Sequence, residues 1–235
     1  MKKIILLATV FFAVQSFAQQ KHPSFMQQGN IYEVNIRQYT PEGTFNAFAK
    51  HIPRLKKMGV QTLWLMPIQP ISTFGRKGTL GSYYAVADYT SVNPEFGTMN
   101  DFNNLIKQAH DLGMKVIIDY VPNHSGADHP WLTTHPDFYE KDSTGKPTFT
   151  ADWSDTRELN FENKEMQDSM INTMKFWVNK TKIDGFRVDV AWGVPNTFWI
   201  RCLQDLKSIN KLLFSTKEFI KFSNNPKNET TCFSV

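Results

Sequence analysis

Two charged side chains interrupt an apolar segment near the end of the chain. In the segment GFRVDVAW (185–192), Arg187 and Asp189 alternate with apolar residues. A strand of this sequence places both charges on one face, with Cα atoms about 6.5 Å apart. A guanidinium at that separation keeps a carboxylate ionised, ready to act as a nucleophile or to stabilise positive charge. Burying such a pair costs desolvation, so a functional role is favoured over the alternative of a structural ion pair.

A second polar group follows another apolar run. The segment DYVPNH carries Asp119, Asn123 and His124. Taken singly, each has a structural interpretation, Asp119 as a loop cap and His124 as a loop histidine. Loops at the carboxyl ends of parallel strands meet at one rim, which is where active sites of α/β proteins lie. We therefore expect these residues to lie near Arg187 and Asp189.

The elements that must position these residues alternate along the chain. Apolar runs predict strands, and segments of helical spacing that end at Gly59 and Gly113 predict helices. The predicted strands are 31–39, 62–66, 115–121 and 183–190, and the predicted helices are 45–58, 101–112, 164–179 and 196–209. Strands that alternate with crossover helices predict an α/β fold with a parallel sheet.

Residues 122–163 form a polar, aromatic-rich stretch between a predicted strand and a predicted helix. This stretch is longer than the loops of compact domains, which indicates an inserted subdomain after the third strand. Several aromatic residues lie in loops or at strand ends, where flat apolar faces suit a sugar ring, although they are also ordinary core residues. They are Tyr83, Tyr84, Trp131, Phe138, Tyr139, Trp153 and Trp192.

The first 18 residues have the layout of a secretory signal peptide. Lys2 and Lys3 precede an apolar run, and Ser16 and Ala18 supply small residues at a cleavage site. The alternative, a membrane anchor, requires about 20 apolar residues, more than this run has. We expect export to the periplasm or the exterior, with no membrane span after cleavage. The net charge of +4 includes no basic cluster, so nothing predicts nucleic-acid binding.

Four segments together resemble the signature segments of the α-amylase family of glycoside hydrolases, in that family's order. They are YYAVADYTSVNPEFGT (83–98), DYVPNH (119–124), LNFEN (159–163) and GFRVDVAW (185–192). The resemblance implies a (β/α)8 TIM barrel with a domain inserted after the third strand, and cleavage of α-glucosidic bonds with retention. Residues 19–211 would then be the first four to five β/α units of the barrel, with 122–163 as the inserted subdomain.

The same resemblance implies roles for individual residues. Asp189 would be the nucleophile that attacks the anomeric carbon, and Arg187 would hold it ionised. The residues implied to contact or support the substrate are Tyr84, Asp119, His124, Arg187 and Trp192. Asn123 and Glu158 match positions that often bind a structural calcium ion. Without the metal, Asn123 would be a turn residue and Glu158 a solvated charge, and the sequence leaves this choice open.

The resemblance weakens after Asn210. Retaining glycosidases need a second carboxyl group about 5 to 5.5 Å from the nucleophile, and Glu218 is the candidate, although Lys217 precedes it where the family has a small residue. The family's third acid and its later strands have no match. We therefore expect a C-terminally truncated barrel, and our hypothesis is that 212–235 comes from a shifted reading frame or a damaged gene end.

Three functions remain open at this point. The first is an exported enzyme that hydrolyses an α-glucan or maltooligosaccharide, or a fragment of one. The second is a transglycosylase or isomerase of the same fold, because the choice between water and sugar as acceptor depends on contacts that a sequence does not reveal. The third is a catalytically inactive glucan-binding protein.

Overall fold

The computed structural model describes residues 29–209 and 231–234. Four strands pair in parallel and in chain order, as the first half of a (β/α)8 barrel requires. They are β1 (Ile31–Val34), β2 (Thr62–Leu65), β3 (Lys115–Tyr120) and β6 (Gly185–Val188). A fifth strand, β7 (Thr231–Ser234), pairs antiparallel with β6, so it does not continue the parallel order. The predicted α/β fold, a partial TIM barrel, is confirmed in these residues.

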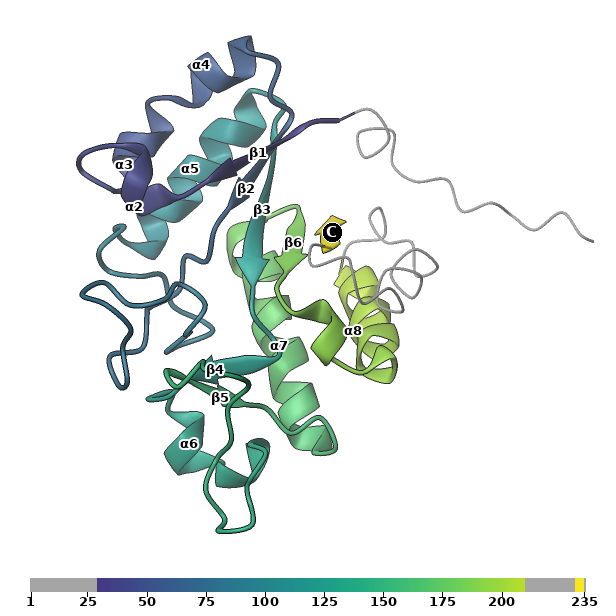
Figure 1. Ribbon diagram of the computed structural model, residues 1–235. Coiled ribbons are helices and arrows are strands. Elements are labelled where there is room, and N and C mark those ends of the chain that lie inside the picture. Colours follow the sequence, from purple (N-terminus) through teal and green to yellow (C-terminus); the bar gives the residue numbers. More distant parts are fainter. Residues whose placement is uncertain (1–28, 210–230, 235) are drawn as a thin grey trace, which may run out of the picture.

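Helices cover one face of the sheet (Figure 1). These are α3 (Phe45–Ala49), α4 (Ile52–Lys57), α5 (Met99–Asp111), α7 (Lys164–Thr181) and α8 (Asn196–Ile209). The strand residues that face them, such as Leu63, Ile118 and Phe186, are fully buried, as are Phe102 of α5 and Trp177 of α7. Burial of these large apolar side chains supplies the main driving force for folding and fixes the strands against their helices.

Two strands and one helix differ most from their predicted bounds. The strand predicted over 31–39 ends at Val34, because the Asn35 side chain accepts a hydrogen bond from the Gln38 amide (3.3 Å) and caps the short helix α2 (Ile36–Tyr39). The helix predicted over 45–58 is interrupted between α3 and α4. Pro53 follows the interruption in the first turn of α4, where its missing N–H is tolerated.

The strand predicted over 183–190 is also shorter than expected. β6 ends at Val188, and Val190 adopts a left-handed backbone conformation with φ of 48°. Val190 therefore does not extend the apolar face formed by Phe186 and Val188. The chain turns instead into η2 (Ala191–Gly193), a single 3-10 turn.

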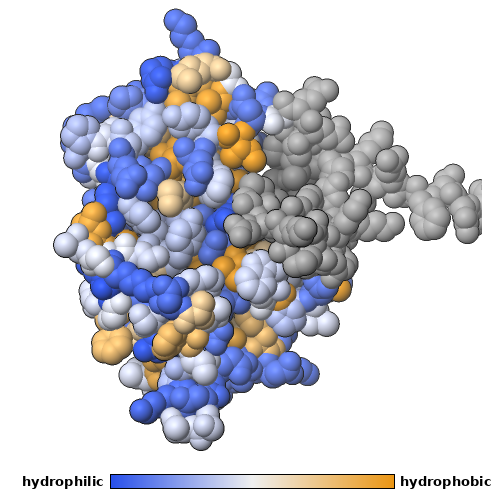
Figure 2. Space-filling view, viewed as in Figure 1, coloured by the Kyte–Doolittle hydropathy of each residue, from blue (hydrophilic) through white to orange (hydrophobic). Residues whose placement is uncertain are grey.

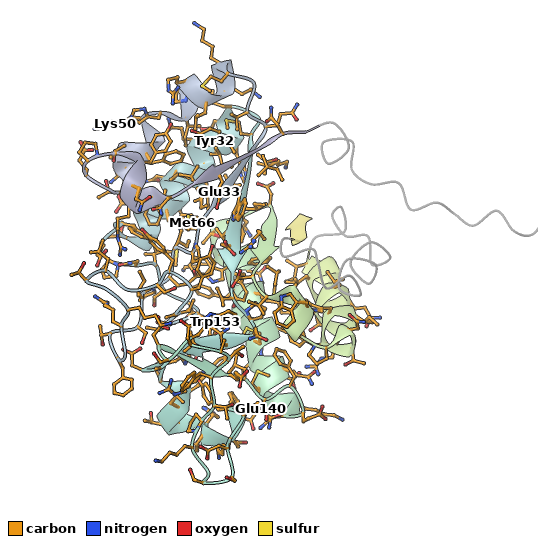
Figure 3. The ribbon with its side chains drawn as sticks, in the orientation of Figure 1. Tyr32, Glu33, Lys50, Met66, Glu140 and Trp153 are labelled. Carbon is orange, nitrogen blue, oxygen red and sulfur yellow. The ribbon has the colours of Figure 1, made fainter. Side chains whose placement is uncertain are left out.

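The segment between β3 and α7 forms a separate layer at the carboxyl ends of the strands (Figure 1). Its antiparallel pair is β4 (His124–Gly126) and β5 (Thr156–Glu158), and α6 (Trp131–Thr134) and η1 (Pro136–Phe138) lie between them in sequence. Figure 3 shows Trp153 on the side of this segment that faces the sheet, and Glu140 farther from the sheet. The segment is thus placed to form one wall of a site at the rim.

The face in view in Figure 2 mixes hydrophilic residues with small, separate hydrophobic patches. Within residues 29–209, no helix is long and apolar enough to cross a membrane. The predicted signal peptide, Glu218 and residues 212–230 of the tail lie outside the described residues.

Candidate active site

One arginine joins two carboxylates at the carboxyl ends of β3 and β6. Asp119 and Arg187 are register partners on these strands. Arg187 Nη1 donates to Asp119 Oδ1 and Oδ2 (3.0 and 3.1 Å) and to Asp189 Oδ1 (2.8 Å). The Asp189 amide donates to the Tyr120 carbonyl (2.8 Å), which fixes the backbone just beyond the strand. The predicted pairing of Arg187 with Asp189 is present, and Asp119 shares the same guanidinium.

The two carboxylates differ in their surroundings. Asp119 is completely buried and accepts a hydrogen bond from the Tyr84 hydroxyl (3.3 Å), whereas the Asp189 side chain is 19% exposed. Burial raises the pKa of Asp119 to about 7, against the opposing charge and hydrogen bonds of Arg187. One guanidinium cannot neutralise both carboxylates, so the more buried of the two carries the desolvation penalty. Asp189 remains the carboxylate that a substrate can reach.

A cavity of about 400 Å³ opens over Asp189. Its walls come from the strand ends, from the loop after β2 and from the inserted segment. The lining residues are Lys77, Ser82, Tyr84, His124, Trp153, Asp155, Thr156, Arg187, Asp189, Val190 and Trp192. Five of the predicted site residues therefore meet at one cavity, namely Tyr84, His124, Arg187, Asp189 and Trp192. Asp119 does not line the cavity, but its carboxylate is hydrogen-bonded to Arg187 and Tyr84, which do.

His124 and two tryptophans give the cavity its chemical character. His124 is buried, and burial lowers its pKa to about 4, so the ring is neutral near pH 7. Its ring lies 5.5 Å from that of Trp153, while Trp192 is more than half exposed at the cavity. Flat apolar faces beside hydrogen-bonding groups match a sugar ring, which has apolar faces and a polar edge. The arrangement can hold a sugar with its anomeric carbon near Asp189.

The backbone around Trp192 explains how that side chain reaches the cavity. The left-handed Val190 reverses the chain after β6, and Gly193 follows Trp192. A Cβ at Gly193 would lie 2.4 Å from Asn123 Oδ1, so a larger residue there would displace the Asn123 side chain. The alternating sequence predicted a strand through Val190 and gave no sign of this turn.

A second, smaller pocket contains both residues predicted to bind calcium. Asn123 and Glu158 line it together with Glu140 and Glu162. The Glu158 carboxylate accepts a hydrogen bond from Thr150, and Asn123 Nδ2 lies 3.2 Å from His124 Nδ1. Within the described part of the chain, no group of three or more histidine, cysteine, aspartate or glutamate side chains is arranged to hold a metal ion. Calcium also takes amide, backbone and water oxygens as ligands, so calcium binding at Asn123 and Glu158 stays a prediction.

Sequence reasoning missed part of the cavity wall. Lys77 and Ser82 come from the loop after β2, and Asp155 and Thr156 from the inserted segment. The sequence placed the insertion near the rim, but it carried no signal for which of its residues face the cavity. Their positions depend on contacts between loops that are far apart in sequence.

Comparison with known proteins agrees with this geometry. A sequence profile described as the α-amylase catalytic domain matches residues 14–153 and 142–221. The chain is 30% identical over 217 residues to Alpha-amylase 3 of Dictyoglomus thermophilum, covering 81% of this chain and 42% of that protein. It is 31% identical over 211 residues to the trehalose synthase of Pimelobacter sp., covering 73% of this chain and 35% of that protein.

A crystal structure of an α-amylase from Lactobacillus plantarum is similar in both fold and sequence. It matches with a TM-score of 0.76 and 39% identity, covering 78% of this chain and 43% of that one. The fold and the rim site define a protein of the TIM-barrel class with its candidate active site at the carboxyl ends of the strands. The chain belongs to the α-amylase family, and it spans less than half the length of these relatives.

Proposed function

We propose that this protein cleaves α-glucosidic bonds of an α-glucan or maltooligosaccharide with retention, through Asp189 as the nucleophile. The observation that carries the proposal is the position of Asp189, held by Arg187 at 2.8 Å in the wall of a cavity with aromatic sides. Its relatives include proteins named α-amylase, which supports the choice of substrate class.

The proposed reaction has two steps. A carboxylate oxygen of Asp189 bonds to C1 of the sugar as the bond from C1 to the leaving oxygen breaks, and a general acid protonates that oxygen. Water, deprotonated by the same group, then attacks C1 and releases Asp189. Arg187 holds Asp189 in place, while the neutral His124 and the hydroxyl of Tyr84 are available to bind sugar hydroxyls.

The general acid is proposed to be Glu218, on the family pattern alone, since it lies outside the described residues. A Glu218→Gln variant separates this role from a structural one. It should lose cleavage of maltotetraose but retain a first-turnover burst of fluoride release from an α-glucosyl fluoride, because fluoride leaves without a proton whereas the second step still needs the base. Equal loss with both substrates would argue against Glu218 as the acid.

The proposal is tested by incubating the full-length protein with maltotetraose and following the anomeric protons by NMR. Release of α-anomers that then mutarotate supports retaining hydrolysis, whereas initial β-anomers contradict it. Asp189→Asn should abolish the reaction. Asp111→Asn, an exposed position in a surface ion pair on α5, is the matched control and should retain it.

Transfer to a sugar acceptor is a second candidate, favoured by the similarity to a trehalose synthase. Both reactions use the same nucleophile, so the products decide between them. Longer oligosaccharides or a rearranged disaccharide formed from maltose would indicate transfer. Binding of maltotetraose without any product would indicate the glucan-binding role.

We also propose that the protein is exported. The support is the basic and apolar N-terminal segment, which ends in Ser16-Phe17-Ala18. N-terminal sequencing of the protein from the producing cell should give Gln19 as the first residue. A mature chain that still begins at Met1 would contradict export by this route.

A further inference from the structure

Asp155 is a buried carboxylate in the cavity wall that the proposed reaction does not use. The residue is 3% exposed and lines the same cavity as Asp189. Its Oδ2 is buried and has no hydrogen-bond partner among the described residues. Buried polar atoms are nearly always paired, and an unpaired one destabilises the fold. An unpaired carboxylate oxygen beside a cavity is accounted for if a ligand supplies the missing donor.

The backbone of Asp155 is held firmly in place. Its carbonyl accepts a hydrogen bond from the Ala127 amide (3.0 Å) at the end of β4. Gly75 of the loop after β2 lies against this backbone, since a Cβ there would lie 3.2 Å from the Ser154 carbonyl oxygen and 3.5 Å from the Asp155 Cα. Two segments distant in sequence thus hold the backbone from which this carboxylate extends.

The charges of the cavity indicate what kind of donor it receives. Besides the two aspartates, the lining includes Lys77, which pairs with Asp152, and Arg187, which pairs with Asp119 and Asp189, so both cations already have carboxylate partners. A ligand without charge leaves these ion pairs intact, and Trp153 and Trp192 provide apolar faces. A neutral polyol satisfies both features, since its hydroxyl groups donate hydrogen bonds.

We propose that Asp155 accepts a hydrogen bond from a sugar hydroxyl and thereby selects the substrate, a statement that rests on the proposed action on α-glucans. A site with a buried polar group discriminates strongly against a ligand that lacks its partner. Asp155 is a specificity-determining residue on this view, contributed by the inserted segment and not by the barrel.

The test is a titration of the full-length protein with maltotetraose, followed by intrinsic fluorescence, since two tryptophans line the cavity. Asp155→Ala should weaken binding about 10- to 100-fold, the range of a hydrogen bond to a charged group. Asp155→Asn, which keeps the shape, guards against misfolding and should weaken it less. Asp142→Asn, an exposed turn residue of the same segment, should bind as wild type does.

Two further measurements separate ligand binding from a structural role. Asp155→Ala should raise the urea midpoint of unfolding, because it removes an unpaired buried group, whereas loss of a structural contact would lower it. A series of maltosides that each lack one hydroxyl identifies the group that contacts Asp155. The compound without that hydroxyl should bind wild type more weakly than maltose does. Asp155→Ala should bind this compound and maltose equally well. Equal affinity of wild type and Asp155→Ala for maltotetraose would overturn the inference alone, while failure of wild type to bind would overturn the proposed function with it.

Discussion

The carboxyl ends and the amino ends of β3 and β6 each hold a buried aspartate with cationic partners, yet the surroundings of the two aspartates differ. At the carboxyl ends, Asp119 and Asp189 share Arg187 beside a cavity. At the amino ends, Asp184 accepts hydrogen bonds from Lys115 Nζ (2.7 Å) and the Val116 amide (2.9 Å), and lies 2.6 Å from His110 Nε2.

The two carboxylates differ in how fully their hydrogen-bond and charge partners offset the cost of burial. Burial acts to raise the pKa of Asp184, but its three hydrogen-bond partners hold that pKa below its ordinary value. Asp119 has its pKa raised to about 7, because burial outweighs a guanidinium that it must share. In TIM barrels, the amino-terminal face stabilises and the carboxyl-terminal face reacts. Here the amino ends hold a carboxylate with three hydrogen-bond partners, and the carboxyl ends hold a carboxylate of raised pKa beside Asp189, the proposed nucleophile.

The largest expected difference between the two ends concerns activity. Asp189→Asn should reduce turnover of maltotetraose by at least about 10³-fold, because an amide cannot form the covalent intermediate. Asp184→Asn should change turnover less than about threefold, since it lies at the far end of the strands. Initial rates measured on both variants check this, and comparable losses would remove the functional distinction between the ends.

Removing the cationic partner of the aspartate should destabilise the protein more at the carboxyl ends of the strands than at the amino ends. Arg187→Ala leaves two carboxylates without their common partner and should lower the free energy of unfolding by about 3 to 5 kcal/mol. Lys115→Ala removes a partly exposed cation and should lower it by less than about 1 kcal/mol, since Asp184 keeps two other partners. Urea unfolding of both variants gives the values, and a larger loss for Lys115→Ala would reverse the comparison.

The two ends should also respond oppositely to pH. Because the pKa of Asp119 is raised in the folded state, the stability linked to it is present below about pH 4 and is lost as the pH rises through about 7. Because the pKa of Asp184 is lowered, its contribution is present above about pH 4 and is lost as the pH falls through the lowered pKa.

Urea unfolding from pH 3 to 8 measures these slopes, with Asp119→Asn and Asp184→Asn compared with wild type. Asp119→Asn should gain stability relative to wild type between about pH 4 and 7. Asp184→Asn should lose stability relative to wild type by about 1 to 3 kcal/mol at neutral pH, and the deficit should shrink in acid. If the free energy of unfolding varied with pH in the same way in both variants, the pKa values of Asp119 and Asp184 would not be shifted in opposite directions.

The smallest expected effect concerns calcium, which we propose binds at the pocket of Asn123 and Glu158 on the carboxyl-terminal side. At about ten times its dissociation constant, calcium would stabilise the fold by about 1.4 kcal/mol. Thermal unfolding with calcium and with a chelator should show this shift in wild type and not in Glu158→Gln. Identical curves for wild type in the two conditions would exclude a stabilising site.

The sequence predicted the parts of this fold that rest on local patterning. Apolar runs predict the parallel strands and helical spacing predicts the helices, and the pairing of Arg187 with Asp189 follows from their two-residue spacing at the end of β6. The break between α3 and α4 and the left-handed Val190 were not predicted, because packing and a tight turn override the apolar pattern there. Asp155 was missed for another reason, since its burial depends on Gly75 and Ala127, which are distant in sequence.

The most direct test of the account is covalent trapping at Asp189. The full-length protein is incubated with 5-fluoro-α-glucosyl fluoride, whose fluoride leaves without a proton from Glu218, and is then digested and analysed by mass spectrometry. The account predicts a fluoroglucosyl ester on Asp189 in wild type and in Asp184→Asn, and none in Asp189→Asn. A folded wild-type protein that binds maltotetraose but forms no adduct, or forms it on another residue, would contradict the claim that Asp189 is the nucleophile.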